Sequence, residues 1–567
     1  MKLLRIFTLV ALCLAFTPSP AVAATGFDSA YSGESAFLTV NPGDTASFQV
    51  FFRNTGTLAW AIGTDTQVDL AACLEDKVTC SAQDSSEATW NTGWLSTGRY
   101  ATHTQAIVST GSLASFAYAI KAPLNATGTH RFNGDLVVGK TGARIKPEGY
   151  YQEATVAAVG SVGPPTTAAD PAVITAWNAI AVRTIAGPAP LGVGKANAEA
   201  FLWYSFVHAA VYNAVVGVTG DYELYKWNER APKGASPQAA AVVAAHQVLR
   251  TYFGSSSAIA TRLDADLATS LGQIADGTSK EDGIAFGRRA ADRLISLRAG
   301  DGRSATVVYR PAQPTAPGVW RPTPPANAPF LAPWLGQVTP LVLDSLTQFQ
   351  PGPPPAIASD LYVREFNEVR DYGAKFGSSR SAAQTETALF YSDISIVPLQ
   401  AALRDLATRK KLSISESARI FAAVDLGLAD SVGTVWNAKF RYGWWRPITA
   451  IREANTDGNP ATAAVPGWEP LIVTPPYPDW PSGAAAGIGV LSTVLSRLNA
   501  DGRVDLNIAS AAAGLTRHYD DPAVFQSDVV NARVWSGIHF RTADEVSAVI
   551  GTQVANWMLD RYFRKLK

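Results

Sequence analysis

The hydrophobic pattern of the chain changes once, at a segment rich in proline, threonine and alanine over residues 161–170. Before it, over residues 26–160, apolar residues such as Phe48 and Val50 recur at every second position between frequent turn signals. That period and spacing are typical of a β-sandwich. After it, over residues 171–567, apolar residues recur three and four positions apart in alanine-rich stretches, as in amphipathic helices. The change therefore predicts a multidomain protein: an all-β sandwich, a linker and an all-α helical bundle. The length of 567 residues allows each domain its own core.

The first 23 residues have the pattern of a secretory signal peptide. Lys2 and Arg5 precede an apolar stretch over residues 6–16, and small residues up to Ala23 fit a cleavage site. Because the apolar stretch is short and two prolines follow it, we expect cleavage rather than a membrane anchor. We therefore expect a secreted or periplasmic protein with no integral membrane segment in the mature chain.

Charge and cysteine content narrow the possible functions. Lysine plus arginine total 47 and aspartate plus glutamate total 47, so the chain lacks the basic excess of a nucleic-acid binder. Of the 3 cysteines, Cys13 lies in the signal peptide, which leaves Cys73 and Cys80. In an oxidising compartment we expect these two to form a disulfide. A metal site is the alternative, but no histidine or further cysteine lies nearby in the sequence.

Three short segments of the helical part collect residues that bind anions. The first contains Lys439 and Arg446, seven positions apart, so that on one helix both side chains would point the same way. Pro447 follows and disfavours a simple continuation of the helix. Two neighbouring cations repel unless an anion lies between them, and Trp444 and Trp445 argue against a solvated basic face.

The other two segments are Pro-Ser-Gly and an arginine followed by a histidine. Ser482 is a natural N-cap for the helix that follows, and the backbone N–H of Gly483 is open to close approach by an anion. Arg533 and His539 are six positions apart and would not align on a straight helix. A break at Gly537 would bring both side chains to one point.

Taken together, the motifs K-x6-R-P, P-S-G and R-x5-H resemble the superfamily of type 2 phosphatidic acid phosphatases and vanadium-dependent haloperoxidases. Residues 206–218, 418–454 and 475–483 resemble its bacterial haloperoxidase branch, and the resemblance covers most of residues 171–567. Residues 26–160 resemble the immunoglobulin-like domains that are appended to secreted bacterial proteins. Such domains bind surfaces or partners, and a plain spacer is the alternative.

The haloperoxidase resemblance implies a cofactor, a site and a reaction. The cofactor is vanadate, and phosphate can occupy the same site. Hydrogen peroxide and a halide are the implied small-molecule substrates, with an organic molecule as a further candidate. His539 would bind vanadium directly, while the other ligands would neutralise or hydrogen-bond the oxyanion: Lys439, Arg446, Ser482, Gly483 and Arg533. The catalytic set is Lys439, Arg446, Arg533 and His539.

Some positions depart from the family pattern. Ala484 stands where an acid–base histidine is usual, and Ala543 stands where a carboxylate is expected. Asp544 follows and either orients His539 or caps the last helix. Asp393 is another candidate partner for an arginine of the site. We expect His208 and His246 to be structural and His518 to lie on the surface.

Three functions stay open at this point. The first is an exported haloperoxidase-like peroxidase that turns over slowly because of Ala484. The second is an acid phosphatase with His539 as nucleophile. The lack of a general acid at Ala484 would slow a phosphatase more than a haloperoxidase, since an alkoxide leaving group needs a proton. The third is a non-catalytic oxyanion-binding or cell-surface protein that recognises its partner through the β-domain.

Overall fold

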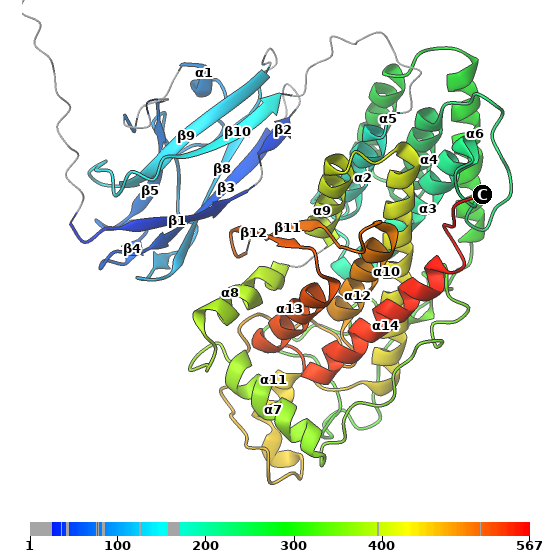
Figure 1. The fold of residues 1–567 in the computed structure, drawn as a ribbon. Helices are drawn as coiled ribbons and strands as arrows, with labels where there is room; N and C mark the ends of the chain where they lie inside the picture. Colours follow the sequence, from blue (N-terminus) through cyan, green and yellow to red (C-terminus); the bar gives the residue numbers. More distant parts are fainter. Residues whose placement is uncertain are drawn as a thin grey trace, which may run out of the picture. The chain divides into compact units, whose positions relative to one another are not determined.

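The chain divides into two compact units, Met1–Gly160 and Ser161–Lys567, which are seen in Figure 1. The computed structural model describes residues 25–35, 37–40, 45–74, 76, 79–81, 85–123, 126, 128–156, 170–393, 396–510 and 512–566. The expected signal peptide at residues 1–23 and residues 161–169 of the expected linker lie outside the described residues, so both stay predictions.

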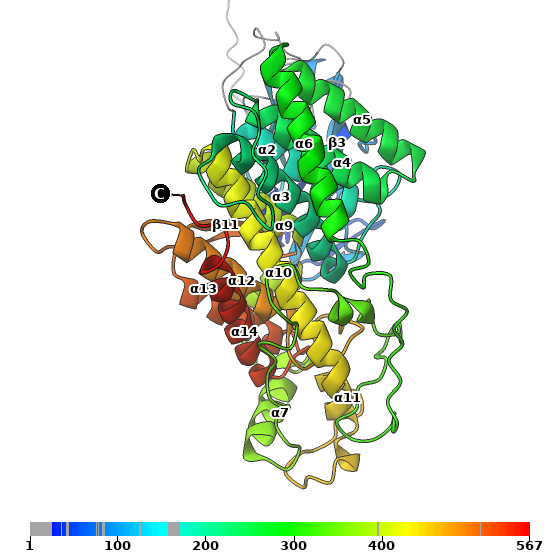
Figure 2. The same ribbon diagram turned by 90° about the vertical axis from the view of Figure 1, so that its right-hand side faces the viewer.

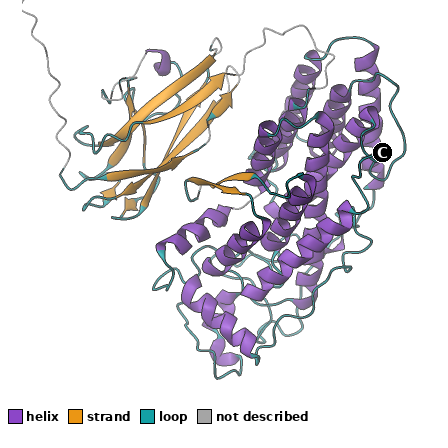
Figure 3. Ribbon diagram, viewed as in Figure 1, coloured by secondary structure: helices purple, strands orange, loops and turns teal. Residues whose placement is uncertain are grey.

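Two sheets form most of the N-terminal unit, shown as orange arrows in Figure 3. The first sheet is antiparallel and has the order β1-β3-β8: β1 Ser29–Glu34, β3 Thr45–Asn54 and β8 Leu113–Lys121. The second has the order β2-β10-β9-β5-β6, with only β2 parallel to its neighbour: β2 Leu38–Val40, β10 Tyr150–Val156, β9 Gly128–Val138, β5 Val68–Cys73 and β6 Arg99–Thr102. Smaller elements complete it: β4 Trp60–Ala61, β7 Ile107–Val108 and α1 Ser85–Ala88.

The two sheets share one hydrophobic core. Phe48 of β3 contacts Phe132 of β9, with ring centroids 5.7 Å apart, so the inward faces of the two sheets meet. Trp60, Trp90 and Trp94 are buried in the same core. The two-residue period in the sequence is therefore the alternation of core-facing and outward side chains along each strand.

Sixteen helical segments are described in the second unit, and the long ones form a bundle (Figure 2). In chain order they are α2 Ala172–Ile185, α3 Asn197–Thr219, α4 Pro237–Phe253, α5 Ser257–Gly272, α6 Thr278–Leu297, η1 Pro333–Gln337, α7 Asp360–Gly373, α8 Ala382–Phe390, η2 Tyr391–Asp393, α9 Ile396–Arg409, α10 Ile414–Tyr442, α11 Pro447–Arg452, η3 Ala454–Thr456, α12 Gly483–Leu498, α13 Pro522–Trp535 and α14 Arg541–Leu559.

The expectation of an all-α unit is wrong at one place. Residues Leu506–Ser510 (β11) and Leu515–Tyr519 (β12) pair as an antiparallel hairpin. Along β11 the side chains alternate between buried and more exposed positions, which is a strand period rather than a helical one. The hairpin is short, and helices dominate the rest of the described unit.

Helix α3 is the buried centre of the bundle and packs beside α10. By length and composition alone α3 could cross a membrane, which the sequence did not lead us to expect of any segment after the signal peptide. However, 89% of its most apolar window is buried inside the unit. Burial among other helices explains its apolar composition without a membrane.

A buried carboxylate fixes part of the long proline-rich region between α6 and α7. The Asp430 side chain of α10 accepts hydrogen bonds from the backbone N–H groups of Leu341, Val342 and Leu343, each at 2.8 Å. Asp430 is 2% exposed, and a buried carboxylate is tolerated when its oxygens are hydrogen-bonded. This contact holds the irregular region against the middle of α10.

The sulfur atoms of Cys73 and Cys80 are joined in a disulfide that closes a short loop after β5. We predict that peptide mapping of the exported protein without reduction finds the two cysteines linked, in a chain that begins after Ala23. Replacing both with serine should lower the free energy of unfolding of the N-terminal unit by about 2–3 kcal/mol, because the loop then opens in the unfolded chain. Two free thiols that alkylate in the exported protein would contradict the disulfide.

Candidate oxyanion-binding site

Lys439 and Arg446 reach the site from two different helices. Helix α10 ends at Tyr442, and Gly443 follows in the left-handed region with φ 53°. A Cβ at Gly443 would lie 1.9 Å from the Tyr309 hydroxyl, so glycine is required there. Arg446 is the extended residue before Pro447, the first residue of α11. The expectation that both cations share one helix is therefore wrong, although they do lie near each other.

Ser482 and Gly483 stand at the start of α12, but the serine does not act as expected. The Ser482 side chain makes no capping hydrogen bond to α12, and its hydroxyl is buried without a hydrogen-bond partner among the described residues. Gly483 packs against the indole of Trp436, where an added Cβ would lie 3.0 Å from Cζ3. The Ser482 hydroxyl is consequently free to donate to a ligand.

Arg533 and His539 flank a turn between α13 and α14. Arg533 lies in the last turn of α13, which ends at Trp535. Gly537 has φ 78°, and a Cβ there would lie 2.4 Å from the Gly373 carbonyl oxygen. The break expected at this glycine is present, and it turns His539 back toward the other site residues.

The His539 imidazole lies at the centre of the cluster. Its Nε2 is 3.1 Å from Nη1 of Arg446, and its Nδ1 is 2.8 Å from Oδ1 of Asp479. Asp479, which precedes the Pro-Ser-Gly motif, is therefore the carboxylate beside His539. No hydrogen bond joins Asp544 to His539 among the described residues, and an orienting role for Asp544 stays a prediction.

Asp544 lies in the first turn of α14 and faces other members of the site. Burial raises the pKa of Asp544 well above its usual range, while the neighbouring Ser482 hydroxyl and Arg533 oppose that shift. Neither of its oxygens has a hydrogen-bond partner at ordinary distance among the described residues. Asp544 therefore caps no backbone group and instead places a buried acidic group near Ser482 and Arg533. Asp393 ends η2, but its side chain lies outside the described part, so that assignment stays a prediction.

The loop before α12 ties the cations in place. Nζ of Lys439 donates to the carbonyl oxygens of Pro478 and Asp479, at 2.5 and 2.9 Å. Nε of Arg446 donates to the carbonyl oxygen of Tyr477 at 2.7 Å. These bonds hold the two cations in fixed positions and leave other N–H groups of each to bind a ligand.

The described site holds more basic than acidic groups. Lys439, Arg446 and Arg533 supply three basic groups against two carboxylic acids, Asp479 and Asp544. Burial, and after it the charge of Arg446, lower the pKa of Lys439 well below its usual range, so an anion beside Lys439 would favour its protonated form. All five residues are buried, none more than 7% exposed. Burial raises the pKa of Asp479 to about 7, although Arg446 and Lys439 oppose the shift. At neutral pH the carboxylates therefore compensate the cations only in part.

His539 adds no charge to this balance. Its burial lowers the pKa of the imidazole well below its usual range, and Arg446, Lys439 and Arg533 lower it further. A neutral imidazole keeps a lone pair on one ring nitrogen, which is the form that binds a metal or acts as a nucleophile. Nδ1 of His539 faces Oδ1 of Asp479, although neither Asp479 oxygen has a hydrogen-bond partner among the described residues. A proton assigned to Nδ1 would put the lone pair on Nε2, beside Nη1 of Arg446.

Three donors of the site have no hydrogen-bond partner within the described residues: Arg446 Nη2, Ser482 Oγ and Arg533 Nε. Leaving a buried donor unpaired costs about 1–3 kcal/mol, and more for a charged group. An anion with several oxygens bound among them would supply both the missing charge and the missing acceptors. The residues present therefore fit a tetrahedral oxyanion such as vanadate or phosphate.

A cavity of about 220 Å³ lies against this cluster. Gly483, Ala484 and Arg533 line it, together with aromatic residues that include Trp436 and Tyr477. Ala484 leaves open the space that a histidine side chain would fill. Of the proposed ligands, Gly483 and Arg533 line this cavity, so a small molecule in it would contact part of the oxyanion site.

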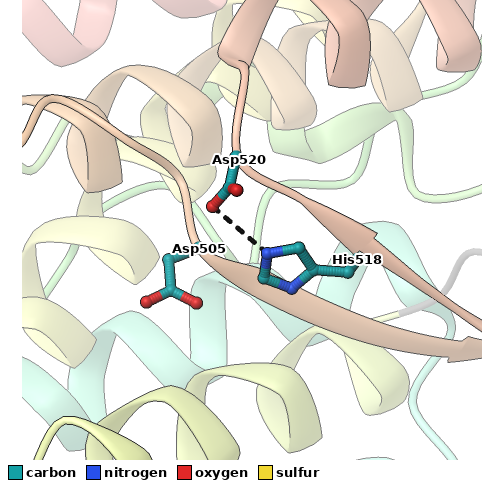
Figure 4. Close-up of side chains that lie close together, drawn as sticks. All are labelled: Asp505, His518 and Asp520. Atoms are coloured by element: carbon teal, nitrogen blue, oxygen red, sulfur yellow. Dashed lines mark ion pairs between the residues drawn. The ribbon is translucent and has the colours of Figure 1, made fainter.

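The remaining histidines are engaged elsewhere. His208 pairs with Asp425 inside the bundle, and His246 lies 2.9 Å from Asp264. Figure 4 shows His518 beside Asp520 and Asp505, with Nε2 of His518 3.1 Å from Asp520. These three residues lie close enough to hold a metal ion.

Cations already compensate the acidic groups of that cluster. Asp505 pairs with Arg409 at 2.8 Å and with Lys410 at 2.7 Å, and Asp520 pairs with Arg503 at 3.2 Å. The structure therefore shows a set of ion pairs that join the hairpin to α9, and we assign it no metal.

Sequence reasoning missed two residues of the site, Asp479 and Tyr477. Both lie in the loop of prolines and aromatic residues before Pro-Ser-Gly. A lone aspartate in such an apolar loop is the signal that points to Asp479, because a buried carboxylate needs a charged or hydrogen-bonding partner. Tyr477 carries no comparable signal.

Comparisons with known proteins concern the fold of the helical unit. Residues 419–567 match the family model of the VCPO second helical-bundle domain. A bacterial vanadium-dependent iodoperoxidase has 20% sequence identity and a TM-score of 0.60, over 71% of this chain and 99% of its own. The apo form of a bacterial vanadium-dependent chloroperoxidase has 17% identity and a TM-score of 0.53, over 66% of this chain and 95% of its own.

The holo form of such a chloroperoxidase has 16% identity and a TM-score of 0.51, over 64% of this chain and 91% of its own. At these identities the structural likeness shows the fold. A comparison with curated proteins gave no match. The family-model match over residues 419–567 and the likeness in fold agree with the resemblance inferred from the three motifs, while the immunoglobulin-like character of the N-terminal unit stays a prediction.

The raised pKa of Asp479 predicts a pH dependence of stability. The folded protein keeps the Asp479 proton up to about pH 7, whereas the unfolded chain loses it near pH 4. Stability therefore falls as pH rises between these values, by at most about 4 kcal/mol from this group. Asp479→Asn cannot ionise and should lack this fall, as measured by urea unfolding at pH 4.5 and 7.5.

Asp505→Asn is the matched control. Burial acts to raise the pKa of Asp505, but hydrogen bonds from Lys410 and Arg409 hold that pKa below its usual value. Its ion pairs therefore stabilise the protein above about pH 4, so this variant should differ from wild type in the opposite direction. If wild type and Asp479→Asn show the same pH dependence, Asp479 does not titrate as inferred.

Proposed function

We propose that this protein is a vanadium-dependent haloperoxidase-like enzyme. Residues 419–567 match the family model of the VCPO second helical-bundle domain, which supports the proposal. The substrates of the enzyme would be hydrogen peroxide and a halide. The observation that carries the proposal is the buried excess of basic groups around a neutral His539, with three unpaired donors beside it.

Each residue of the cluster has a task in this proposal. His539 would bind vanadium through Nε2 in place of its present contact with Nη1 of Arg446, with Asp479 beside Nδ1 orienting the imidazole. Arg446 and Arg533 would donate their unpaired N–H groups to the oxyanion, and the Ser482 hydroxyl would add a further bond. Lys439 keeps one N–H beyond its two bonds to carbonyl oxygens and adds its charge.

Bound vanadate would supply the activation of peroxide that halide oxidation requires. The chain itself contributes orientation, charge and exclusion of water, because every proposed ligand is buried. Ala484 contributes neither a hydrogen bond nor a proton at the cavity wall. General acid–base groups typically contribute about 10²–10⁴-fold to rate, so we expect slow turnover.

An acid phosphatase is the second candidate, because the same features suit phosphoryl transfer. Nε2 of neutral His539 would be the nucleophile, and five-coordinate vanadate resembles the phosphoryl-transfer transition state. Against this candidate, Ala484 provides no proton for the leaving alkoxide. We therefore place the phosphatase behind the haloperoxidase.

We also propose that the protein is exported and that its N-terminal unit is an immunoglobulin-like domain. The disulfide between Cys73 and Cys80 suits an oxidising compartment. Two sheets around one core that contains Trp60 suit the domain type. Such a unit would serve surface or partner binding, while the oxyanion site lies within the helical unit.

The purified protein should oxidise bromide with hydrogen peroxide only when orthovanadate is added. Ala484→His should raise the turnover, toward the range that a general acid–base group supplies, with little change in vanadate affinity. His539→Ala should abolish vanadate binding, whereas His518→Ala, a change in the exposed hairpin, should leave binding unchanged. The phosphatase would be favoured by a different outcome: Ala484→His raises the hydrolysis of an aryl phosphate, and bromide oxidation stays absent. Failure to bind either oxyanion would leave a non-catalytic protein.

A further inference from the structure

Tyr477 is a wall of the cavity that the proposed function does not use. Its ring packs against Trp436, with centroids 4.9 Å apart, and both residues line the cavity with Gly483, Ala484 and Arg533. The tyrosine thus shares one small space with the start of α12 and with a cation of the site.

The ring of Tyr477 lies beside two of the buried cations. Nζ of Lys439 is 5.1 Å from the ring centroid, and the guanidinium carbon of Arg446 is 4.9 Å from it. Cations at such distances are attracted to the face of an aromatic ring. The ring therefore has a structural task that does not require its hydroxyl.

The backbone of Tyr477 is fixed to the same cluster. Its carbonyl oxygen accepts a hydrogen bond from Nε of Arg446 at 2.7 Å, and its N–H donates to the Pro475 carbonyl at 2.9 Å. Because both the ring and the backbone are held, the phenol is positioned before any ligand arrives.

The hydroxyl is the part of Tyr477 without a task. Within the described residues it has no hydrogen-bond partner. Burial lowers the pKa of Arg533, and among its neighbours the Tyr477 phenol opposes that shift most strongly. Burial likewise lowers the pKa of Arg446, which Asp479 and then Tyr477 oppose. The phenol oxygen therefore lies within electrostatic reach of both guanidinium groups.

We infer that the Tyr477 hydroxyl is an additional ligand of the bound oxyanion, donating a hydrogen bond from the wall of the cavity. This inference rests on the proposed oxyanion site. It adds a neutral donor to the cations and makes Tyr477 a binding residue.

The test is the affinity of the full-length protein for orthovanadate and, separately, for inorganic phosphate, by equilibrium titration at pH 7. Tyr477→Phe keeps the ring between Lys439 and Arg446 and removes only the oxygen. A hydrogen bond to a charged group contributes enough that its loss should weaken binding of both anions on the order of tenfold to a hundredfold. Thermal unfolding should show that the variant is folded.

Tyr252→Phe is the matched control, because it removes a tyrosine hydroxyl without a hydrogen-bond partner among the described residues, from α4 and away from the cavity lining. Its affinities should equal those of wild type. If folded Tyr477→Phe binds both anions as tightly as wild type, the inference is overturned. Wild type that binds the anions but oxidises no halide would overturn the proposed activity alone, and wild type that binds neither would overturn both.

Discussion

The repulsion among three buried cations is the constraint that the helical unit has to satisfy. Lys439, Arg446 and Arg533 lie around one imidazole in a part of the protein that excludes water. Such charges are strongly unfavourable unless they are paired. Asp479 and Asp544 offset them in part, but burial raises the pKa of both carboxyl groups. The protein alone does not balance the cluster, and a bound anion would.

The fold holds these cations in place mainly through one loop. Residues 474–482 run between η3 and α12, and their carbonyl groups accept hydrogen bonds from both Lys439 and Arg446. The same loop supplies Asp479 to His539 and Tyr477 to the cavity wall. Because one segment meets all these partners, the site is largely formed before a ligand binds.

Much of this arrangement could be predicted from the sequence, since its chemistry is carried by charged residues in short motifs. The helical period, the three motifs and the break at Gly537 led to the correct fold of the helical unit and to residues that do lie together. The helix end at Gly443 was missed, because only the Tyr309 hydroxyl, more than a hundred positions away, shows why glycine is needed there. Asp479 and Tyr477 were missed for a related reason. Their roles depend on contacts with cations from other elements.

A vanadium position determined by anomalous diffraction, from crystals grown with orthovanadate at neutral pH, tests the oxyanion site most directly. We predict one strong peak within bonding distance of His539 Nε2, with oxygens directed to Arg446, Ser482 and Arg533. A protein that binds vanadate elsewhere, for example at the ion-paired hairpin around His518, would contradict the site. So would crystals of well-ordered protein with no vanadium at the cluster.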